Sequence, residues 1–129
     1  MPDEPIDRDE LLYRRVIHNH YKQGDPTLPL PYAALKPEKR DITGLSLFRN
    51  RYRTAESIVR PGRPDYVAVF HVGTLLDNGI NVVISEAGGS GHVEIPDVTY
   101  DRRKDIHVTE IIDLMTKELY REVLGPFNS

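Results

Sequence analysis

The clearest hydrophobic pattern lies near the C-terminal end of the chain. Apolar residues recur there at helical spacing, at Val108, Ile111, Ile112, Met115, Leu119 and Val123. This spacing places them on one stripe of an amphipathic α-helix. Asp105 stands where an N-cap is expected, and Gly125-Pro126 is a usual helix stop. The pattern therefore predicts one long C-terminal helix.

Shorter segments have the β-branched and aromatic composition of strands. They span residues 43–49, 66–72, 80–85 and 92–95. A glycine-rich turn separates the last two, which are therefore expected to form a hairpin. Short helical turns are expected at 32–35, at 54–59 with Thr54 as the cap, and at 74–78 before Gly79.

Residues 11–17 fit either a helix or a strand. Leu12 and Val16 share a face in a helix, and acidic residues precede them. We expect a helix, although the strand interpretation is equally acceptable on pattern alone. The choice matters for His18 and His20, whose rings would share one side only on a strand. We favour polar residues at a helix end for this pair, so no metal site is predicted.

Together these elements indicate an α+β fold. A small antiparallel or mixed sheet is expected, with the C-terminal amphipathic helix packed on one face. Residues 9–126 are expected to form a single domain, because 129 residues is an ordinary single-domain length. Residues 1–8 contain two prolines and few apolar side chains, so a loose acidic N-terminal tail is expected.

Composition excludes several classes of site. The chain has no cysteine, which rules out disulfides, thiolate zinc sites and cysteine nucleophiles. No apolar segment is long enough to cross a bilayer, and the acidic start lacks the features of a signal peptide. We therefore expect a cytoplasmic protein with no membrane association, and we predict no cofactor.

Charge is unevenly distributed along the chain. The net charge is −3, which argues against a whole-domain nucleic-acid binder. Residues 36–63 nevertheless carry eight basic and three acidic side chains. Such a segment can attract an anionic partner. A solvated face balanced by the protein's own acids is the favoured interpretation.

The sequence His92-Val93-Glu94 is one candidate catalytic site. On a strand, His92 and Glu94 face the same way, and a carboxylate beside an imidazole can orient it for acid–base chemistry. The preceding glycines could present backbone N–H groups to an anion. They match no phosphate-binding motif, however, and a rim histidine paired with an acid is the favoured alternative.

Arg49, Arg51 and Arg53 form a second candidate site. If the strand that begins near residue 43 continues, all three share one face and could grip phosphate or carboxylate oxygens. The same charges on an edge strand would discourage edge-to-edge aggregation, and we prefer this interpretation.

The order of short motifs along the chain resembles a family of small uncharacterised bacterial proteins. The resemblance rests on Leu12-Tyr13-Arg14-Arg15-Val16, Gly44-Leu45-Ser46-Leu47, Thr54-Ala55-Glu56 and Gly91-His92-Val93-Glu94-Ile95. It implies a bacterial source and a stand-alone domain. The family has no established activity, so it assigns no catalytic residue, although it adds some weight to His92 and Glu94.

Two functions are compatible with these observations. The first is a non-enzymatic binding or accessory module acting through a protein partner or a homodimer. The alternative is a small enzyme acting on a phosphorylated or nucleotide-like substrate, with His92 and Glu94 as its acid–base pair and the three arginines as an anion clamp. Nucleic-acid binding by the basic segment is possible but not favoured. Whether the protein is an enzyme is left open.

Overall fold

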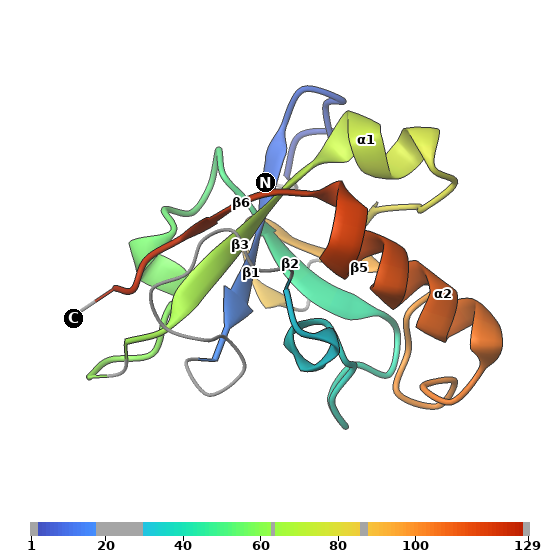
Figure 1. Cartoon of the computed structure of the whole chain (residues 1–129). Coiled ribbons are helices and arrows are strands. Elements are labelled where there is room, and N and C mark those ends of the chain that lie inside the picture. The colour runs from blue at the N-terminus through green and yellow to red at the C-terminus, as the bar shows by residue number, and fades with distance from the viewer. Residues whose placement is uncertain (1–2, 18–29, 63, 86–87, 128–129) are drawn as a thin grey trace.

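A six-stranded antiparallel sheet forms the centre of the protein. The computed structural model describes residues 3–17, 30–62, 64–85 and 88–127. The strand order is β4-β5-β2-β1-β3-β6, and every neighbouring pair is antiparallel (Figure 1). The strands are β1 (Leu11–Val16), β2 (Leu45–Arg49), β3 (Tyr66–His71), β4 (Val83–Ile84), β5 (His92–Ile95) and β6 (Tyr120–Leu124). The α+β class and an antiparallel sheet are thus confirmed.

The first strand occupies a central place in the sheet. β1 forms six residue pairs with β3, but only two with β2, at Leu12↔Arg49 and Tyr13↔Phe48. The expected helix at residues 11–17 is therefore wrong. Spacing of four puts Leu12 and Val16 on one side of a strand as well as of a helix, and both are fully buried. Pairing on both edges, which local sequence does not reveal, decides for the strand.

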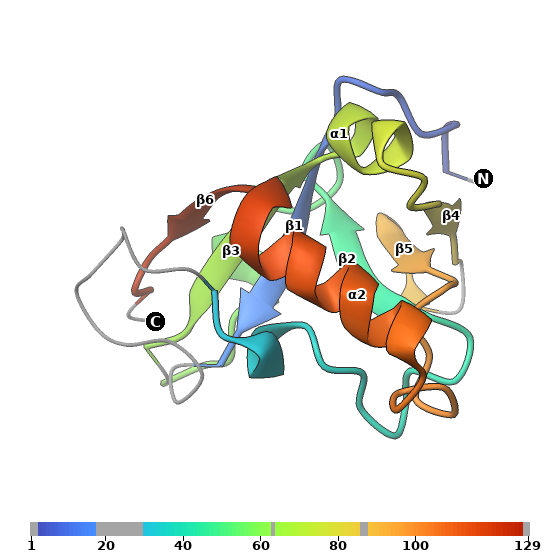
Figure 2. The same cartoon turned by 45° about the vertical axis from the view of Figure 1, so that its right-hand side comes forward.

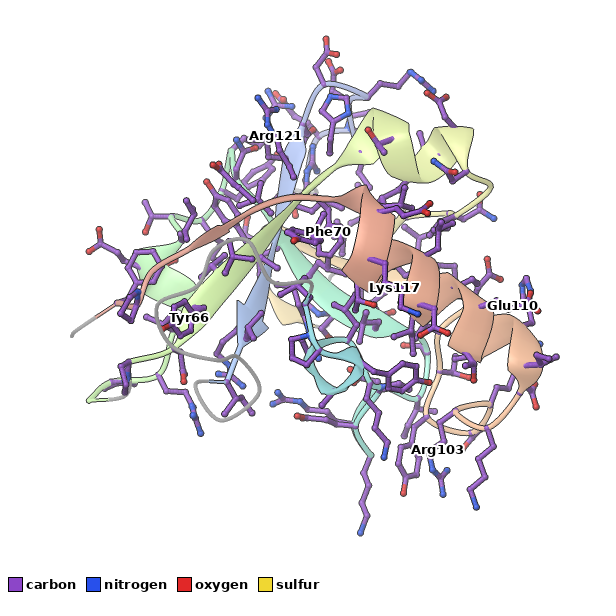
Figure 3. All side chains as sticks on the ribbon, in the orientation of Figure 1. Tyr66, Phe70, Arg103, Glu110, Lys117 and Arg121 are labelled. Atoms are coloured by element: carbon purple, nitrogen blue, oxygen red, sulfur yellow. The ribbon has the colours of Figure 1, made fainter. Side chains whose placement is uncertain are left out.

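The main core lies on one face of the sheet. α2 (Ile106–Leu114) continues into the π-helical turn η5 (Met115–Leu119), and Figure 2 shows α2 crossing in front of the strands. The buried helix residues belong to the same apolar cluster as residues of β1, β2, β3 and β5; they are Val108, Ile111, Ile112 and Met115. Phe70 of β3 is fully buried in this cluster, whereas Glu110 and Lys117 extend from the exposed side of the helix (Figure 3).

The C-terminal helix ends earlier than its apolar pattern predicts. The chain becomes extended at Tyr120, and Val123 pairs with Ala68 of β3 as part of β6. Val123 thus matches the helical spacing by coincidence, because it lies on the edge strand β6 and not on the helix. Asp105 occupies the N-cap position but makes no side-chain capping bond, because its carboxylate accepts from Arg102 Nε at 2.8 Å.

The short helices and most of the strands lie near the positions that the sequence predicts. The helical turns η2 (Tyr32–Ala34) and η3 (Glu56–Ile58) and the short helix α1 (Val72–Asp77) lie close to where they are expected. The strands expected at 43–49, 66–72 and 92–95 are confirmed as β2, β3 and β5. The predicted strand at 80–85 shortens to β4, which forms the expected hairpin with β5.

The opposite face of the sheet carries a second, smaller apolar cluster. Its buried members are Ile58, Val59 and Val67, and the side chains of Tyr13 and Phe48 pack against them. Strand alternation explains why the two clusters are separate. Tyr66 and Ala68 point into the main core, so Val67, which lies between them in the sequence, points to the opposite face. This cluster leaves the rest of the face to polar and charged side chains.

Residues 3–6 are held against the domain, which differs from the loose tail expected for residues 1–8. The Asp3 carboxylate accepts from the Gly91 amide at 2.7 Å and from Ser90 Oγ at 2.9 Å. The carbonyls of Glu4 and Pro5 accept from the Arg49 guanidinium, and Ile6 packs against the main core. Among the described residues, no helix has the length and apolar character needed to span a membrane.

Candidate anion-binding pocket

A cavity of about 680 Å³ opens on the sheet face that carries the smaller apolar cluster. Ser46 and Phe48 of β2 line it, because they alternate with the core residues Leu45 and Leu47. His92 and Glu94 of β5 lie opposite Phe48 and Ser46 in the register, and they line the same cavity. Its volume lies in the ordinary range for a small-molecule site.

Five arginines line this cavity, and they are Arg14, Arg15, Arg40, Arg53 and Arg60. Of the lining residues that the structure describes, only Glu38 and Glu94 carry a carboxylate. Positive charge therefore predominates in the wall, and the function of each arginine depends on what already neutralises it.

Arg14 is bound to the backbone. Its Nε donates to the Ala34 carbonyl at 3.2 Å, and its Nη1 donates to the Ser46 carbonyl at 3.0 Å. β1 and β2 form no residue pairs beyond Tyr13↔Phe48, so the guanidinium joins the strands where their ladder has ended. Burial lowers the pKa of Arg14. These bonds give Arg14 a structural role at the cavity wall.

Among the described residues, none forms a hydrogen bond or an ion pair with the Arg15 side chain. Arg15 follows Arg14 on β1 and therefore points to the opposite side of the sheet. Burial lowers its pKa, and the nearby charges of Arg40 and Arg60 lower it further, against a smaller opposite effect of Asp65 and Glu38. The guanidinium is thus half-buried among charges of both signs.

The other three arginines have contacts of their own. Arg40 Nε lies 3.3 Å from Glu38, and Arg60 Nε lies 2.8 Å from Asp65. Arg53 donates from Nε to the Ser90 carbonyl at 3.1 Å and stacks 4.8 Å above the Phe48 ring. Carboxylates thus compensate Arg40 and Arg60, and of the five arginines Arg15 is the one without a contact of this kind in the described part of the chain.

His92 is held by a backbone carbonyl rather than by a carboxylate. Its Nδ1 lies 3.0 Å from the Ser85 carbonyl, which can only accept, so Nδ1 carries the proton. The other ring nitrogen, Nε2, is then the acceptor of the neutral imidazole. Gly88 covers the ring so closely that a Cβ there would lie 2.3 Å from His92 Cγ.

Glu94 forms a separate contact. Its two carboxylate oxygens accept from the Thr43 hydroxyl at 2.8 and 2.9 Å. The structure therefore places His92 and Glu94 on one face of one cavity, as the sequence predicts, but with different hydrogen-bond partners. The Ser85 carbonyl, which the sequence did not indicate, orients the imidazole instead.

The structure does not bring Arg49, Arg51 and Arg53 together. β2 ends at Arg49, and the next residues form a turn in which the Arg53 amide donates to the Arg49 carbonyl. Arg49 is fully buried and donates from Nε to Glu10 at 2.7 Å. Arg51 pairs with Glu4 at 2.9 Å, and only Arg53 lines the cavity. The alternation that suggested a clamp stops where the strand stops.

Arg14 and Arg15 are cavity residues that the sequence did not indicate, whereas Arg40, Arg53 and Arg60 belong to the basic segment 36–63. The available signal for the first two was the Arg14-Arg15 pair, whose side chains must point to opposite faces if residues 11–16 are a strand. His18 and His20 lie outside the described residues. Within the described ranges, no group of three or more histidine, aspartate or glutamate side chains is arranged to hold a metal ion.

The cavity wall therefore contains a guanidinium, that of Arg15, with no hydrogen-bond or ion-pair partner among the described residues, together with the His92 imidazole and the Glu94 carboxylate. Comparison with known proteins finds no matching family model, no matching curated protein and no matching solved structure.

Proposed function

We propose that this protein is a non-enzymatic binding module whose ligand carries a carboxylate or phosphate group held in the cavity. The observation that supports the proposal is Arg15, a half-buried guanidinium without a partner among the described residues. Removing a charge from water is costly unless an opposite charge or hydrogen-bond acceptor compensates for it. An anion entering the cavity supplies that compensation.

The chemistry of the wall fits this class of ligand. A guanidinium offers two parallel N–H groups that match two oxygens of a carboxylate or phosphate. Arg40 and Arg60 lie close enough to Arg15 to lower its pKa, and the carboxylates of Glu38 and Asp65, which pair with them, offset part of their positive potential. Phe48, Ile58 and Val59 provide an apolar part of the lining against which a ligand body can pack.

Thermal unfolding with added inorganic phosphate or acetate, at constant ionic strength, tests the proposal. We expect the anions to raise the melting temperature of the native chain, because a ligand that binds only the folded state stabilises it. The rise should disappear in Arg15→Gln and persist in Arg121→Gln, which removes an exposed charge from β6 outside the cavity. An equal rise in both variants, or none in the native chain, would contradict the proposal.

A small enzyme acting on a phosphorylated or nucleotide-like substrate is the second candidate. It is favoured by the position of His92, whose Nδ1–H bond to Ser85 leaves Nε2 to accept a proton in the cavity. In this alternative, His92 is the acid–base group, Arg15 replaces the three-arginine clamp, and Glu94 lies beside the substrate. Turnover of phosphate monoesters that is abolished in His92→Gln while phosphate binding is retained would favour it.

A protein partner or homodimer, a cytoplasmic location and a bacterial source stay predictions. An acidic side chain of a partner is one form that the anion could take. Light scattering on the purified chain measures whether a homodimer exists. Thermal shift with acidic peptides, compared between the native chain and Arg15→Gln, measures whether a partner would use the cavity.

A further inference from the structure

Two opposite charges face the same cavity without neutralising each other. Arg15 has no hydrogen bond or ion pair to any described residue, and Glu94 forms no ion pair with one, since its oxygens accept only from Thr43. Arg15 and Glu94 line the same cavity but form no ion pair with each other. The cavity therefore contains one positive and one negative group at separate positions.

The order of the strands explains the separation. The β1–β2 ladder ends at Tyr13↔Phe48, and Arg15 pairs instead with Val67 of β3. Glu94 lies on β5, where it pairs with Ser46 of β2. Because β2 lies between β1 and β5, at least two strand spacings separate the two charged residues, or about 10 Å between the backbones.

We propose that the ligand is zwitterionic, with its carboxylate or phosphate group at Arg15 and an ammonium group at Glu94. This inference rests on the proposed function, because it uses the same anion position. Glu94 lies on the cavity face with acceptor capacity beyond its bond to Thr43, and a carboxylate has about four lone-pair sites. It attracts a cationic group and repels a second anion.

The intervening wall indicates the shape of such a ligand. β2 lies between the strands that carry the two charged residues, and its small Ser46 side chain lines the cavity there. Phe48, Ile58 and Val59 supply the apolar part of the lining. The ligand therefore has an extended, largely apolar body with opposite charges at its two ends. Simple ω-amino acids have this form and serve as probes.

Calorimetric titration with three matched probes tests the inference. ε-Aminocaproate carries both charges, caproate lacks the ammonium group, and hexamethylenediamine lacks the carboxylate. We expect ε-aminocaproate to bind about tenfold more tightly than caproate, and hexamethylenediamine not to bind. Glu94→Gln should reduce ε-aminocaproate affinity to that of caproate while leaving caproate binding unchanged. Arg15→Gln should weaken both.

The possible outcomes separate this inference from the proposed function. If caproate and phosphate bind at Arg15 but the ammonium group adds no affinity, the zwitterion inference is wrong and the anion-binding module stands. If no anion binds, both are wrong. If Glu94→Gln fails to fold, the comparison of the three probes on the native chain still decides, because equal affinity for ε-aminocaproate and caproate overturns the inference.

Discussion

The guanidinium of Arg49 is bound by groups of its own chain. Alternation suggested an exposed anion clamp, but Arg49 faces the main core and is fully buried. Its guanidinium donates to both Glu10 oxygens and to the carbonyls of Glu4 and Pro5. Four of its five N–H groups are therefore bound within the protein, and its burial keeps it from an external anion.

The Glu10–Arg49 pair makes stability depend on pH. Burial raises the pKa of Glu10, but the bonds from Arg49 and from the Asp7 amide outweigh this effect and hold the pKa below its usual 4.5. A lowered folded-state pKa stabilises the protein above the unfolded value, and the stabilisation is lost as pH falls through the folded value. Glu10→Gln should therefore cost about 3 kcal/mol at neutral pH and much less at about pH 3.

Urea unfolding of the native chain and Glu10→Gln at the two pH values measures this difference. Glu110→Gln, on the exposed side of α2, is the control, and we expect little change at either pH. A cost for Glu10→Gln that is the same in acid as at neutral pH would show that the carboxylate charge does not contribute.

Gly88 has a defined role at the cavity. A Cβ at this position would lie 2.3 Å from both Cγ and Nδ1 of His92, so Gly88→Ala must displace the imidazole from the Ser85 carbonyl. We expect the ring nitrogen shifts of His92, measured by NMR, to lose the fixed Nδ1–H tautomer. Gly79→Ala is the control, because a Cβ there meets nothing within 4 Å and only its positive φ of 74° is strained. An unchanged His92 spectrum in Gly88→Ala would contradict this geometry.

At the scale of elements, local pattern predicts strands well where composition is strongly β-type. β3 and β5 appear within a residue of their expected bounds. Pattern fails for β1 and for the end of the C-terminal helix. Leu12 and Val16 have a spacing that both structures satisfy, and Val123 continues a helical stripe although it lies on β6. Both failures arise because strand pairing joins residues far apart in the sequence.

The candidate site was predictable only where it lies within one strand. His92 and Glu94 share a face because β5 is a strand, and the sequence indicates that strand. The placement of Arg15 depends on β1 being a strand and on its register with β3, in which Arg15 pairs with Val67. No local pattern contains that register, so the most important cation of the cavity could not be identified from the sequence.

Strand pairing predicts an order of backbone protection. β1 and β3 form six pairs in the middle of the sheet, whereas β4 has two residues at its edge. Hydrogen–deuterium exchange should therefore be slowest at the amides shared by β1 and β3 and much faster in β4. Exchange in β4 that is as slow as in β1 would contradict this topology or indicate that a partner covers the edge.

For the whole molecule, the two faces of the sheet have different roles. The α2 face contains the main apolar core, and the other face contains the cavity beside a small apolar cluster. Ile112→Ala, on the core side, should cost about 3 kcal/mol of unfolding free energy while anion affinity at low temperature stays unchanged.

Arg15→Gln should have the opposite effect to Ile112→Ala. We expect it to abolish anion affinity. The free energy of unfolding should stay nearly unchanged or increase, because the substitution removes a half-buried charge that has no ion-pair partner among the described residues. Chemical denaturation and anion titration of both variants provide the comparison. If stability and affinity fall together in both variants, the two faces are not independent.

The central place of β1 also has a consequence for how the chain folds during synthesis. Residues 11–16 leave the ribosome before β3, which contains their six partners at residues 66–71. Until β3 emerges, β1 can form only its two pairs with β2, and Val16 has no paired strand beside it. Contacts between residues so far apart in the sequence form slowly. We therefore expect folding to be delayed until β3 has emerged, and β1 then to pair between β2 and β3.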